Sequence, residues 1–296
     1  MTIPKRIFYV WGANESKRPD VEWCIKSWEK TLPDYEIIEI NENNTDFFNF
    51  EEELEKNKWF KTVYDRKLHA YVSDFIRIKT LYNNGGIYLD TDVTTIKPFD
   101  EFLNEPAFVG LQTDKKYPND FVEPAVLGAE KGNAFLKQVM DFYDDEIWKR
   151  QIYRIPTIFG YLLKRNYGDF PNEIREKQKI VRYDTISVYP EKVFIPFRYN
   201  EMFVPSCIKK ETCTIHWFGG SWAKPEVMFF MENKHKIPIE NIDAEYVKYY
   251  KKKLKKNKLS FLQKIFSVKN EYKQNEKYKV ITILGIKILF EVSTSI

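Results

Sequence analysis

The stretch HAYVSDFIRIKTLYNNGGIYLDTDVTTIK, residues 69–97, decides the fold of this chain. Its first half and the residue before it carry apolar side chains at helical spacing, which predicts a helix with one face toward a core: Leu68, Val72, Phe75, Ile76 and Leu81. The Asn-Asn-Gly-Gly sequence at 83–86 tolerates positive φ and predicts the end of that helix. Residues 87–89 are short and apolar, like a buried strand. The stretch therefore predicts a helix, a turn and a strand, with Asp90 and Asp92 directly after the strand.

Asp90 and Asp92 are two residues apart, so in an extended chain their side chains point the same way. Two neighbouring carboxylates repel each other, and a divalent cation removes that cost. Mg²⁺ and Mn²⁺ take carboxylate and phosphate oxygens as ligands. The two residues can share one metal, or one can bind it directly and the other through water or a sugar hydroxyl. The alternative is an ordinary turn, because Asp is common after strands.

Residues of this stretch together resemble the DXD region of glycosyltransferase family 32: Ala70, Ser73, Asp74, Arg77, Gly85, Gly86, Ile87, Tyr88, Asp90 and Asp92. That family includes bacterial capsule and lipopolysaccharide enzymes and is related to the glucosyltransferase domains of large clostridial toxins. The resemblance covers roughly residues 3 to 230. It implies a GT-A fold, a nucleotide-sugar donor, a divalent metal (usually Mn²⁺, otherwise Mg²⁺) and retention of anomeric configuration.

The resemblance also implies the roles of single residues. Asp74, Arg77, Asp90 and Asp92 are the expected catalytic residues. Arg77 would add positive charge near the donor, and Asp74 would accept hydrogen bonds from sugar hydroxyls. The expected metal ligands are Asp90, Asp92 and His216. The expected donor-binding residues are Trp11, Asn41, Ser73, Asp74, Arg77, Tyr88, Asp90, Ser221 and Trp222.

Two of these donor-binding residues follow predicted strands near the start of the chain. Trp11 ends a strand at 5–11, and Asn41 follows a strand at 35–40. Ligands of open α/β sheets lie outside the carboxyl ends of strands. Position alone leaves Trp11 open between a core residue and a base-stacking residue, and the resemblance favours the donor base.

His216, Ser221 and Trp222 belong to the segment HWFGGSW, residues 216–222, which follows a last predicted strand at 214–217. It resembles the C-terminal motif of the family, where a His approaches the metal and a Trp indole donates to a phosphate oxygen. A single His is otherwise more often structural than a ligand.

The order of elements predicts an α/β fold with mostly parallel strands. We expect a GT-A type, single Rossmann-like nucleotide-sugar-binding domain over residues 1–243. Further strands are expected at 107–111 and 125–128, and helices at 133–148 and 156–166. Residues 244–296 form a Lys-rich extension with a helix at 245–258, an amphipathic segment at 259–268 and a β-hairpin-like pair of segments at 278–292.

Charge is distributed unevenly along the 296 residues, whose net charge is +4. Residues 246–296 contain thirteen Lys, no Arg and three acidic residues, a net charge of +10. Residues 1–245 contain 34 basic and 40 acidic residues, a net charge of −6. Basic charge with amphipathic segments favours peripheral contact between 246–296 and an anionic membrane, rather than nucleic acid.

Three scattered cysteines, Cys24, Cys207 and Cys213, fit a reducing compartment. With no predicted signal peptide or membrane span, we expect a cytoplasmic protein, peripheral at the inner face of the cytoplasmic membrane.

The sequence therefore predicts a metal-dependent retaining glycosyltransferase. It would move a hexose from a nucleotide diphosphate sugar, UDP-linked, to a glycan or lipid-linked acceptor in bacterial surface polysaccharide synthesis. Two alternatives stay open. Residues 90–94 also fit the DxDx[TV] pattern of haloacid-dehalogenase-like phosphatases, with Asp90 as nucleophile. The chain can also be a non-catalytic carbohydrate- or membrane-binding protein on a transferase fold.

Overall fold

The computed structural model describes residues 2–112, 122–169, 178–198, 201–220, 229, 233, 236–237, 241–273, 276–283 and 286–291; beyond residue 256 only the backbone is described. The chain divides into two compact units, Met1–Trp222 and Ala223–Ile296. The expected boundary at residue 243 stays a prediction.

The first unit is built on a seven-stranded sheet with the order β2-β1-β3-β6-β5-β8-β7. Its strands are β1 (Arg6–Val10), β2 (Glu36–Ile40), β3 (Gly86–Leu89), β5 (Ala107–Leu111), β6 (Val122–Ala129), β7 (Val181–Arg182) and β8 (Ser187–Tyr189). Strands β6 and β7 run against the other five. The expected α/β architecture with mostly parallel strands is confirmed.

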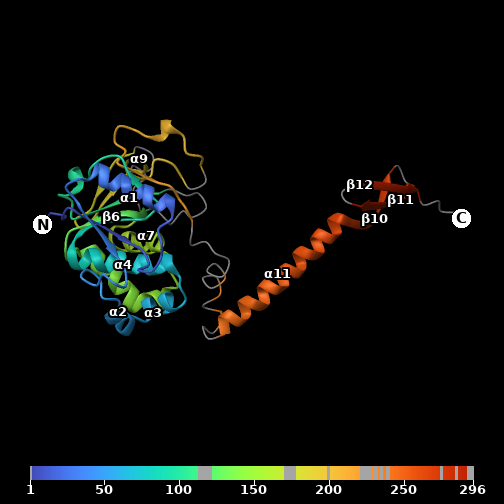
Figure 1. Cartoon of the computed structure of the whole chain (residues 1–296), viewed down its shortest axis with the longest axis horizontal. Coiled ribbons are helices and arrows are strands. Elements are labelled where there is room, and N and C mark those ends of the chain that lie inside the picture. The colour runs from blue at the N-terminus through green and yellow to red at the C-terminus, as the bar shows by residue number, and fades with distance from the viewer. Residues whose placement is uncertain are drawn as a thin grey trace. The chain divides into compact units, whose positions relative to one another are not determined.

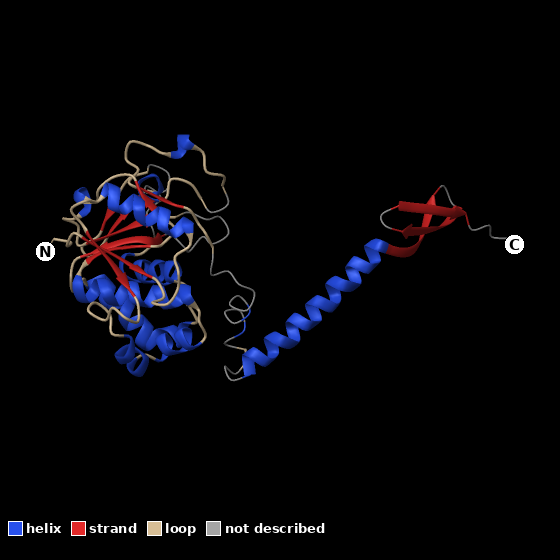
Figure 2. Cartoon of the chain, in the orientation of Figure 1, coloured by secondary structure: helices blue, strands red, loops and turns tan. Residues whose placement is uncertain are grey.

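Helices cover both faces of this sheet, with α1 on one side and α4 and α7 on the other (Figure 1, Figure 2). The α-helices of the first unit are α1 (Pro19–Thr31), α2 (Phe50–Lys56), α3 (Lys58–Asp65), α4 (His69–Asn84), α5 (Ala134–Asp141), α6 (Ile147–Arg150), α7 (Ile155–Tyr167) and α9 (Glu191–Phe194). Shorter turns are η1 (Asp100–Phe102), η2 (Phe142–Glu146) and η3 (Pro205–Cys207). The helix expected at 133–148 is interrupted by η2, which is a π-helical turn.

The turn between α4 and β3 has the backbone that its two glycines permit. Gly85 and Gly86 have φ values of 66° and 129°. A Cβ at Gly86 would approach a ring carbon of Phe8 to 2.8 Å, so no larger residue fits between β3 and β1. The expected helix stop and buried strand are confirmed.

A separate two-stranded antiparallel sheet joins β4 (Val93–Thr95) to β9 (Thr214–His216). Val93 lies opposite His216. The indole Nε1 of Trp28, on α1, donates to the carbonyl of Val93 over 2.7 Å and fixes β4 against the first helix. This pairing places His216 next to the Asp pair, although more than a hundred residues separate them in the sequence.

The second unit contains α11 (Ile242–Ile265) and three strands, β10 (Phe266–Lys273), β11 (Glu276–Ile283) and β12 (Ile286–Glu291), in an antiparallel meander. The expected helix end at 258 was wrong, because residues 242–265 contain no Pro or Gly to end the helix. The segment expected at 259–268 is divided between α11 and β10. The pairing of β10 with β11 makes the expected hairpin three-stranded. No helix in the described part of the chain has the length and apolarity needed to span a membrane.

Candidate metal and donor site

Three potential metal ligands meet at the carboxyl end of β3. Asp90 follows β3, Asp92 precedes β4, and His216 ends β9. One ligand atom from each lies within 4.8 Å of the others. Two ligands on opposite sides of one ion are about 4 to 5 Å apart, because metal–oxygen distances run from about 2.0 to 2.6 Å. The three side chains are therefore spaced as ligands of one cation.

Asp92 is held from two sides. Its Oδ2 accepts the backbone N–H of Gly219 over 2.8 Å, and its Oδ1 lies 3.3 Å from Nε2 of His216. Burial alone would raise the pKa of Asp92, but the His216 charge and the Gly219 hydrogen bond outweigh it and lower that pKa to about 2. Burial alone would lower the pKa of His216, because it disfavours the charged imidazolium. The Asp92 charge outweighs burial and raises the pKa of His216 to about 9. Without metal, the imidazolium of His216 balances the carboxylate.

Arg77 joins α4 to the metal ligands. Its Nη2 donates to Asp90 Oδ1 over 2.7 Å and lies 3.1 Å from Asp74 Oδ1. Its Nη1 donates to the carbonyl of Pro124. The guanidinium carbon stands 4.4 Å from the ring centre of Tyr88, and the side chain is only 3% exposed. Because Arg77 is buried and held on several sides, it fixes Asp90 and Asp74 in one orientation.

Acidic side chains around this centre outnumber the cations that balance them. Burial raises the pKa of Asp74 to about 7, although Arg77 opposes the shift. Burial raises the pKa of Glu123 to about 7, and the Asp90 charge adds to it while His216 opposes it. The pKa of Asp90 is also raised by burial. A bound divalent cation would relieve this excess of negative charge.

The residues present fit a divalent metal. Two carboxylates and one imidazole form a donor set that Mn²⁺ and Mg²⁺ use when substrate phosphates complete their coordination. The Nδ1 of His216 is buried and has no hydrogen-bond partner among the described residues. A buried imidazole nitrogen without a partner is costly in a purely structural histidine.

Ser73 and Tyr88 line the same region. The Ser73 hydroxyl donates to the carbonyl of Ala70 over 2.9 Å. The guanidinium carbon of Arg77 lies 4.4 Å from the ring centre of Tyr88, and the same guanidinium contacts Asp74 and Asp90. Arg77 thus connects Tyr88, Asp74 and Asp90.

Trp11 and Asn41 follow the neighbouring strands β1 and β2, and the backbone N–H of Trp11 donates to the carbonyl of Ile40. The Trp11 indole donates to the carbonyl of Glu15 over 2.8 Å. The Asn41 side chain accepts two backbone N–H groups and donates to Glu39, so it shapes its own turn. Their predicted contact with the donor base stays a prediction. The predicted residues Ser221 and Trp222 lie outside the described residues.

Glu123 is a site residue that the sequence analysis missed. It lies on β6, which extends beyond the end of β3: the N–H of Asp90 donates to the carbonyl of Ala125, two residues from Glu123. The sequence feature that could have identified Glu123 is its place as an acidic residue within the apolar run at 121–129. The strand was expected only from residue 125, so Glu123 fell outside it.

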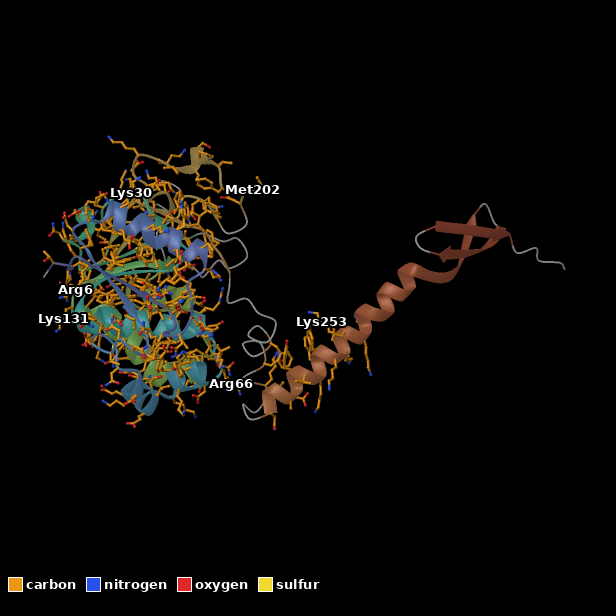
Figure 3. All side chains as sticks on the ribbon, viewed as in Figure 1. Arg6, Lys30, Arg66, Lys131, Met202 and Lys253 are labelled. Atoms are coloured by element: carbon orange, nitrogen blue, oxygen red, sulfur yellow. The ribbon has the colours of Figure 1, made fainter. Side chains whose placement is uncertain are left out.

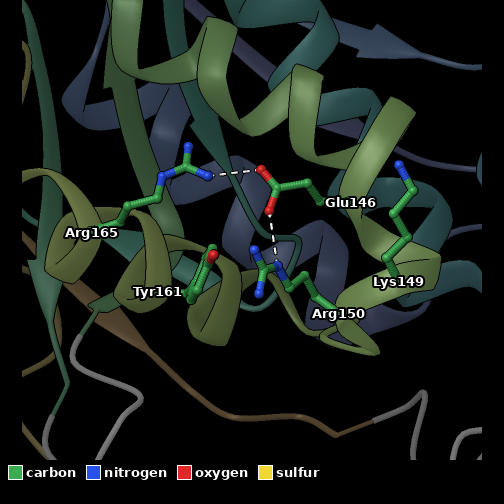
Figure 4. A pocket seen from close by; sticks show the side chains of 5 residues that line it. All are labelled: Glu146, Lys149, Arg150, Tyr161 and Arg165. Carbon is green, nitrogen blue, oxygen red and sulfur yellow. Dashed lines mark hydrogen bonds and ion pairs between the residues drawn. The ribbon is translucent and has the colours of Figure 1, made fainter.

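A surface pocket of about 380 Å³ lies elsewhere, between η2, α6 and α7 (Figure 4). Glu146 accepts from Arg150 over 3.2 Å and from Arg165 over 2.7 Å, and both guanidinium carbons lie 5.6 Å from the Tyr161 ring centre. These contacts form an exposed ion-pair network, and none of the pocket's residues belongs to the Asp90 centre.

Fold and site together define a class: an α/β sheet with a DXD-type group of three potential metal ligands at the carboxyl end of a central strand. Residues 19–109 match the family model described as "Glycosyltransferase sugar-binding region containing DXD motif". The matched part includes Asp74, Arg77, Asp90 and Asp92, and ends before Glu123 and His216.

Two curated relatives are fungal proteins. The chain is 34% identical over 140 residues to inositol phosphoceramide mannosyltransferase 3 of Schizosaccharomyces pombe, covering 47% of this chain and 36% of that protein. It is 28% identical over 98 residues to glucan organizing enzyme 1 of Cryptococcus neoformans var. grubii serotype A, covering 30% and 27%. The chain thus spans about a third of the length of the relatives it matches.

Solved structures of glycosyltransferases are also similar. The PaToxG glycosyltransferase has a TM-score of 0.46 at 17% identity, covering 60% of this chain and 74% of that chain. A glycosyltransferase involved in glycosylation of the major capsid of PBCV-1 has a TM-score of 0.37 at 15% identity, covering 76% and 98%. The UDP-bound glycosyltransferase domain from the YGT toxin has a TM-score of 0.36 at 11% identity, covering 59% and 69%.

Proposed function

We propose that the chain is a metal-dependent retaining glycosyltransferase of GT-A type that uses a nucleotide diphosphate sugar. The observation that carries this proposal is the convergence of Asp90, Asp92 and His216 on one point, within and just beyond the region matching the DXD family model. When bound, Mn²⁺ or Mg²⁺ would neutralise charge on the leaving diphosphate.

The protein's own residues bind and orient the donor. Asp90 and Asp92 offer carboxylate oxygens and His216 offers an imidazole nitrogen, all within 4.8 Å of one another. Asp74, fixed by Arg77, accepts hydrogen bonds from donor hydroxyls and sets the orientation of the sugar. Arg77 adds a buried positive charge near the developing negative charge of the leaving group.

Retention of configuration follows a front-face route in this proposal. The acceptor oxygen approaches on the side that the leaving diphosphate departs from, and the diphosphate helps to take the acceptor proton. Glu123 faces the same centre, with a pKa of about 7 in the metal-free protein, so its carboxyl can hold a proton or accept one from the acceptor hydroxyl.

An exposed apolar patch beside the centre favours a lipid-linked acceptor over a soluble glycan. Trp23 is 55% exposed and packs on Trp217, with ring centres 5.5 Å apart. Phe203 packs on Trp217 from 5.0 Å, and its neighbour Met202 is 86% exposed. The backbone N–H of Trp217 donates to the carbonyl of Asp92, so the patch adjoins the metal centre. Contiguous exposed apolar surface often marks a binding site.

One relative is named for mannosyl transfer to inositol phosphoceramide, which is consistent with a lipid acceptor and makes mannose a candidate sugar. The relatives give no support for the expected role in bacterial surface polysaccharide synthesis, which rests on the resemblance of the DXD region alone. Nucleotide release from UDP- and GDP-linked glucose, galactose, mannose and their N-acetyl forms tests donor use, each with and without Mn²⁺. Metal-dependent release from one or two donors supports the proposal, and release from none contradicts it.

The phosphatase alternative makes a different prediction for the same residue. It requires turnover of p-nitrophenyl phosphate with phosphate trapped covalently on Asp90. In the structure Asp90 Oδ1 accepts from Arg77 and the carboxylate belongs to the three-ligand group, an arrangement that favours a metal ligand over a free nucleophile.

A further inference from the structure

Three of the four exposed large apolar side chains in the described part of α11 lie on one stripe of this helix in the second unit, and the fourth is Tyr249. Val247 is 47% exposed, Tyr250 is 42% exposed and Leu254 is 51% exposed. At about 100° per residue these three positions fall within an arc of about 60° on the helix. A soluble helix that keeps such a stripe uncovered needs a partner for it.

Lysines border this stripe on both sides. By the same helical spacing, Lys251 lies about 40° beyond Val247, and Lys253 lies about 60° beyond Tyr250. Lys253 is labelled on the helix in Figure 3. Long lysine side chains at such borders can lay their methylene stems along an apolar phase while the ammonium groups reach outward.

The neighbouring face of α11 is partly covered by aromatic contacts within the unit, although Tyr249 on that face is still 47% exposed. Phe229 is buried and packs on Tyr246 and Tyr249, with ring centres 5.5 and 5.1 Å apart. Tyr246 and Tyr250 also stack, at 5.8 Å. The aromatic contacts therefore anchor one side of the helix and leave the stripe of Val247, Tyr250 and Leu254 exposed.

We propose that α11 binds an anionic lipid surface, with Val247, Tyr250 and Leu254 inserted shallowly and the surrounding lysines over the head groups. The occupant follows from charge: residues 246–296 carry a net charge of +10, whereas residues 1–245 carry −6. A cationic helix with an apolar stripe and low overall hydrophobicity is the pattern of interfacial membrane helices. This inference does not depend on the proposed enzymatic activity.

Sedimentation of the full chain with vesicles tests the proposal. Protein should pellet with phosphatidylglycerol vesicles at about 0.1 M salt, pellet poorly with pure phosphatidylcholine, and be released as salt rises, because the Debye length shortens. Lys251→Gln with Lys253→Gln should lower partitioning about 25-fold, since each lysine contributes about fivefold. The matched control is Lys30→Gln with Lys131→Gln, two exposed lysines of the first unit labelled in Figure 3.

A second pair of substitutions tests the contribution of the apolar stripe to vesicle binding. Val247→Gln with Leu254→Gln keeps helix-forming residues and should lower partitioning at least about tenfold. Ile180→Gln removes an exposed apolar side chain from the first unit and should change partitioning less than about twofold. Circular dichroism confirms that the variants are folded.

Four results would overturn the proposal. The first is that full-length protein does not pellet with phosphatidylglycerol vesicles at low salt. The second is equal binding to phosphatidylcholine vesicles, and the third is binding that neither pair of α11 substitutions reduces. The fourth is a stable dimer that Val247→Gln with Leu254→Gln separates, which would assign the stripe to a second copy of the chain.

Discussion

Nε2 of His216 lies 3.3 Å from Oδ1 of Asp92, although the two residues are 124 positions apart in sequence. The antiparallel pairing of β4 with β9 creates this contact, since Val93 is the register partner of His216. A raised pKa of His216, to about 9, lets a protonated imidazole compensate the Asp92 charge as a bound cation would. Metal binding and imidazole protonation are therefore alternatives at this position.

Metal binding should release a proton from His216. The pKa of His216 is raised to about 9 in the metal-free protein, so the imidazole is charged at about pH 8 and must lose its proton to bind a cation. Calorimetric titration of Mn²⁺ in two buffers of different ionisation enthalpy should report about one proton released. Below about pH 9, affinity should fall up to about tenfold per pH unit. His216→Gln should bind more weakly and release no proton; wild-type binding without proton release would refute this.

Gly219→Ala should weaken metal binding while leaving the fold intact. A Cβ at this position would approach Asp92 Oδ2 to 3.3 Å and press on a carboxylate that Gly219 now holds by its backbone N–H. We expect an increase of about tenfold in the Kd for Mn²⁺, the size of effect typical for groups that orient metal ligands.

Gly12→Ala is the matched control for this substitution. Its Cβ would approach the Glu15 side chain to 3.1 Å, but that side chain is exposed and can move away. Its affinity for Mn²⁺ should stay near that of wild type. An unchanged affinity in Gly219→Ala would show that Asp92 does not need this contact.

Asp74→Asn should stabilise the protein at high pH while reducing activity. Burial raises the folded-state pKa of Asp74 from 3.8 to about 7, so the folded state binds the proton more tightly than the unfolded chain. The free energy of unfolding therefore falls as pH rises from about 4 to about 7. The full difference corresponds to at most about 4 kcal/mol at 1.36 kcal/mol per pH unit.

Thermal unfolding measures this effect. At about pH 8 the Tm of Asp74→Asn should exceed that of wild type by several degrees, and at about pH 4 the two should nearly coincide. Asp145→Asn, at an exposed position of η2, should change the Tm little at either pH. A destabilised Asp74→Asn at about pH 8 would show that the Arg77 pair outweighs burial.

Replacing Arg77 should have the opposite effect on stability. Arg77→Met leaves Asp74 and Asp90 without their shared cation, and we expect a loss of about 3–5 kcal/mol at about pH 8. The loss should shrink at low pH, where the carboxyls are protonated. Arg77→Lys keeps the charge but cannot bond both carboxylates and the Pro124 carbonyl together, so it should recover only part of the loss. Urea denaturation measures each variant, and a Met variant as stable as wild type would contradict this prediction.

The central part of the fold could be predicted because its signals are local. The apolar spacing of α4, the positive φ values at Gly85 and Gly86 and the short apolar β3 are all properties of neighbouring residues. Asp90 and Asp92 were predicted as a pair for the same reason. The family resemblance supplied His216, which no spacing in the sequence connects to them.

What the sequence did not predict depends on contacts between distant segments. The β4–β9 pairing and the position of Glu123, two residues from the Ala125 carbonyl that accepts from the N–H of Asp90, require the sheet to be assembled first. The helix after residue 258 continues to Ile265 because nothing in its sequence stops it, while β10 begins where pairing with β11 becomes available.

The central claim is that Asp90, Asp92 and His216 hold a metal that bridges a nucleotide diphosphate. The most direct test is calorimetric titration of UDP, with and without Mn²⁺, in wild type and in Asp92→Asn. The account predicts that Mn²⁺ tightens UDP binding at least about tenfold in wild type and has no such effect in Asp92→Asn, while Asp145→Asn behaves as wild type. Equal affinity of wild type for UDP in the presence and absence of Mn²⁺, or an undiminished metal effect in Asp92→Asn, would contradict it.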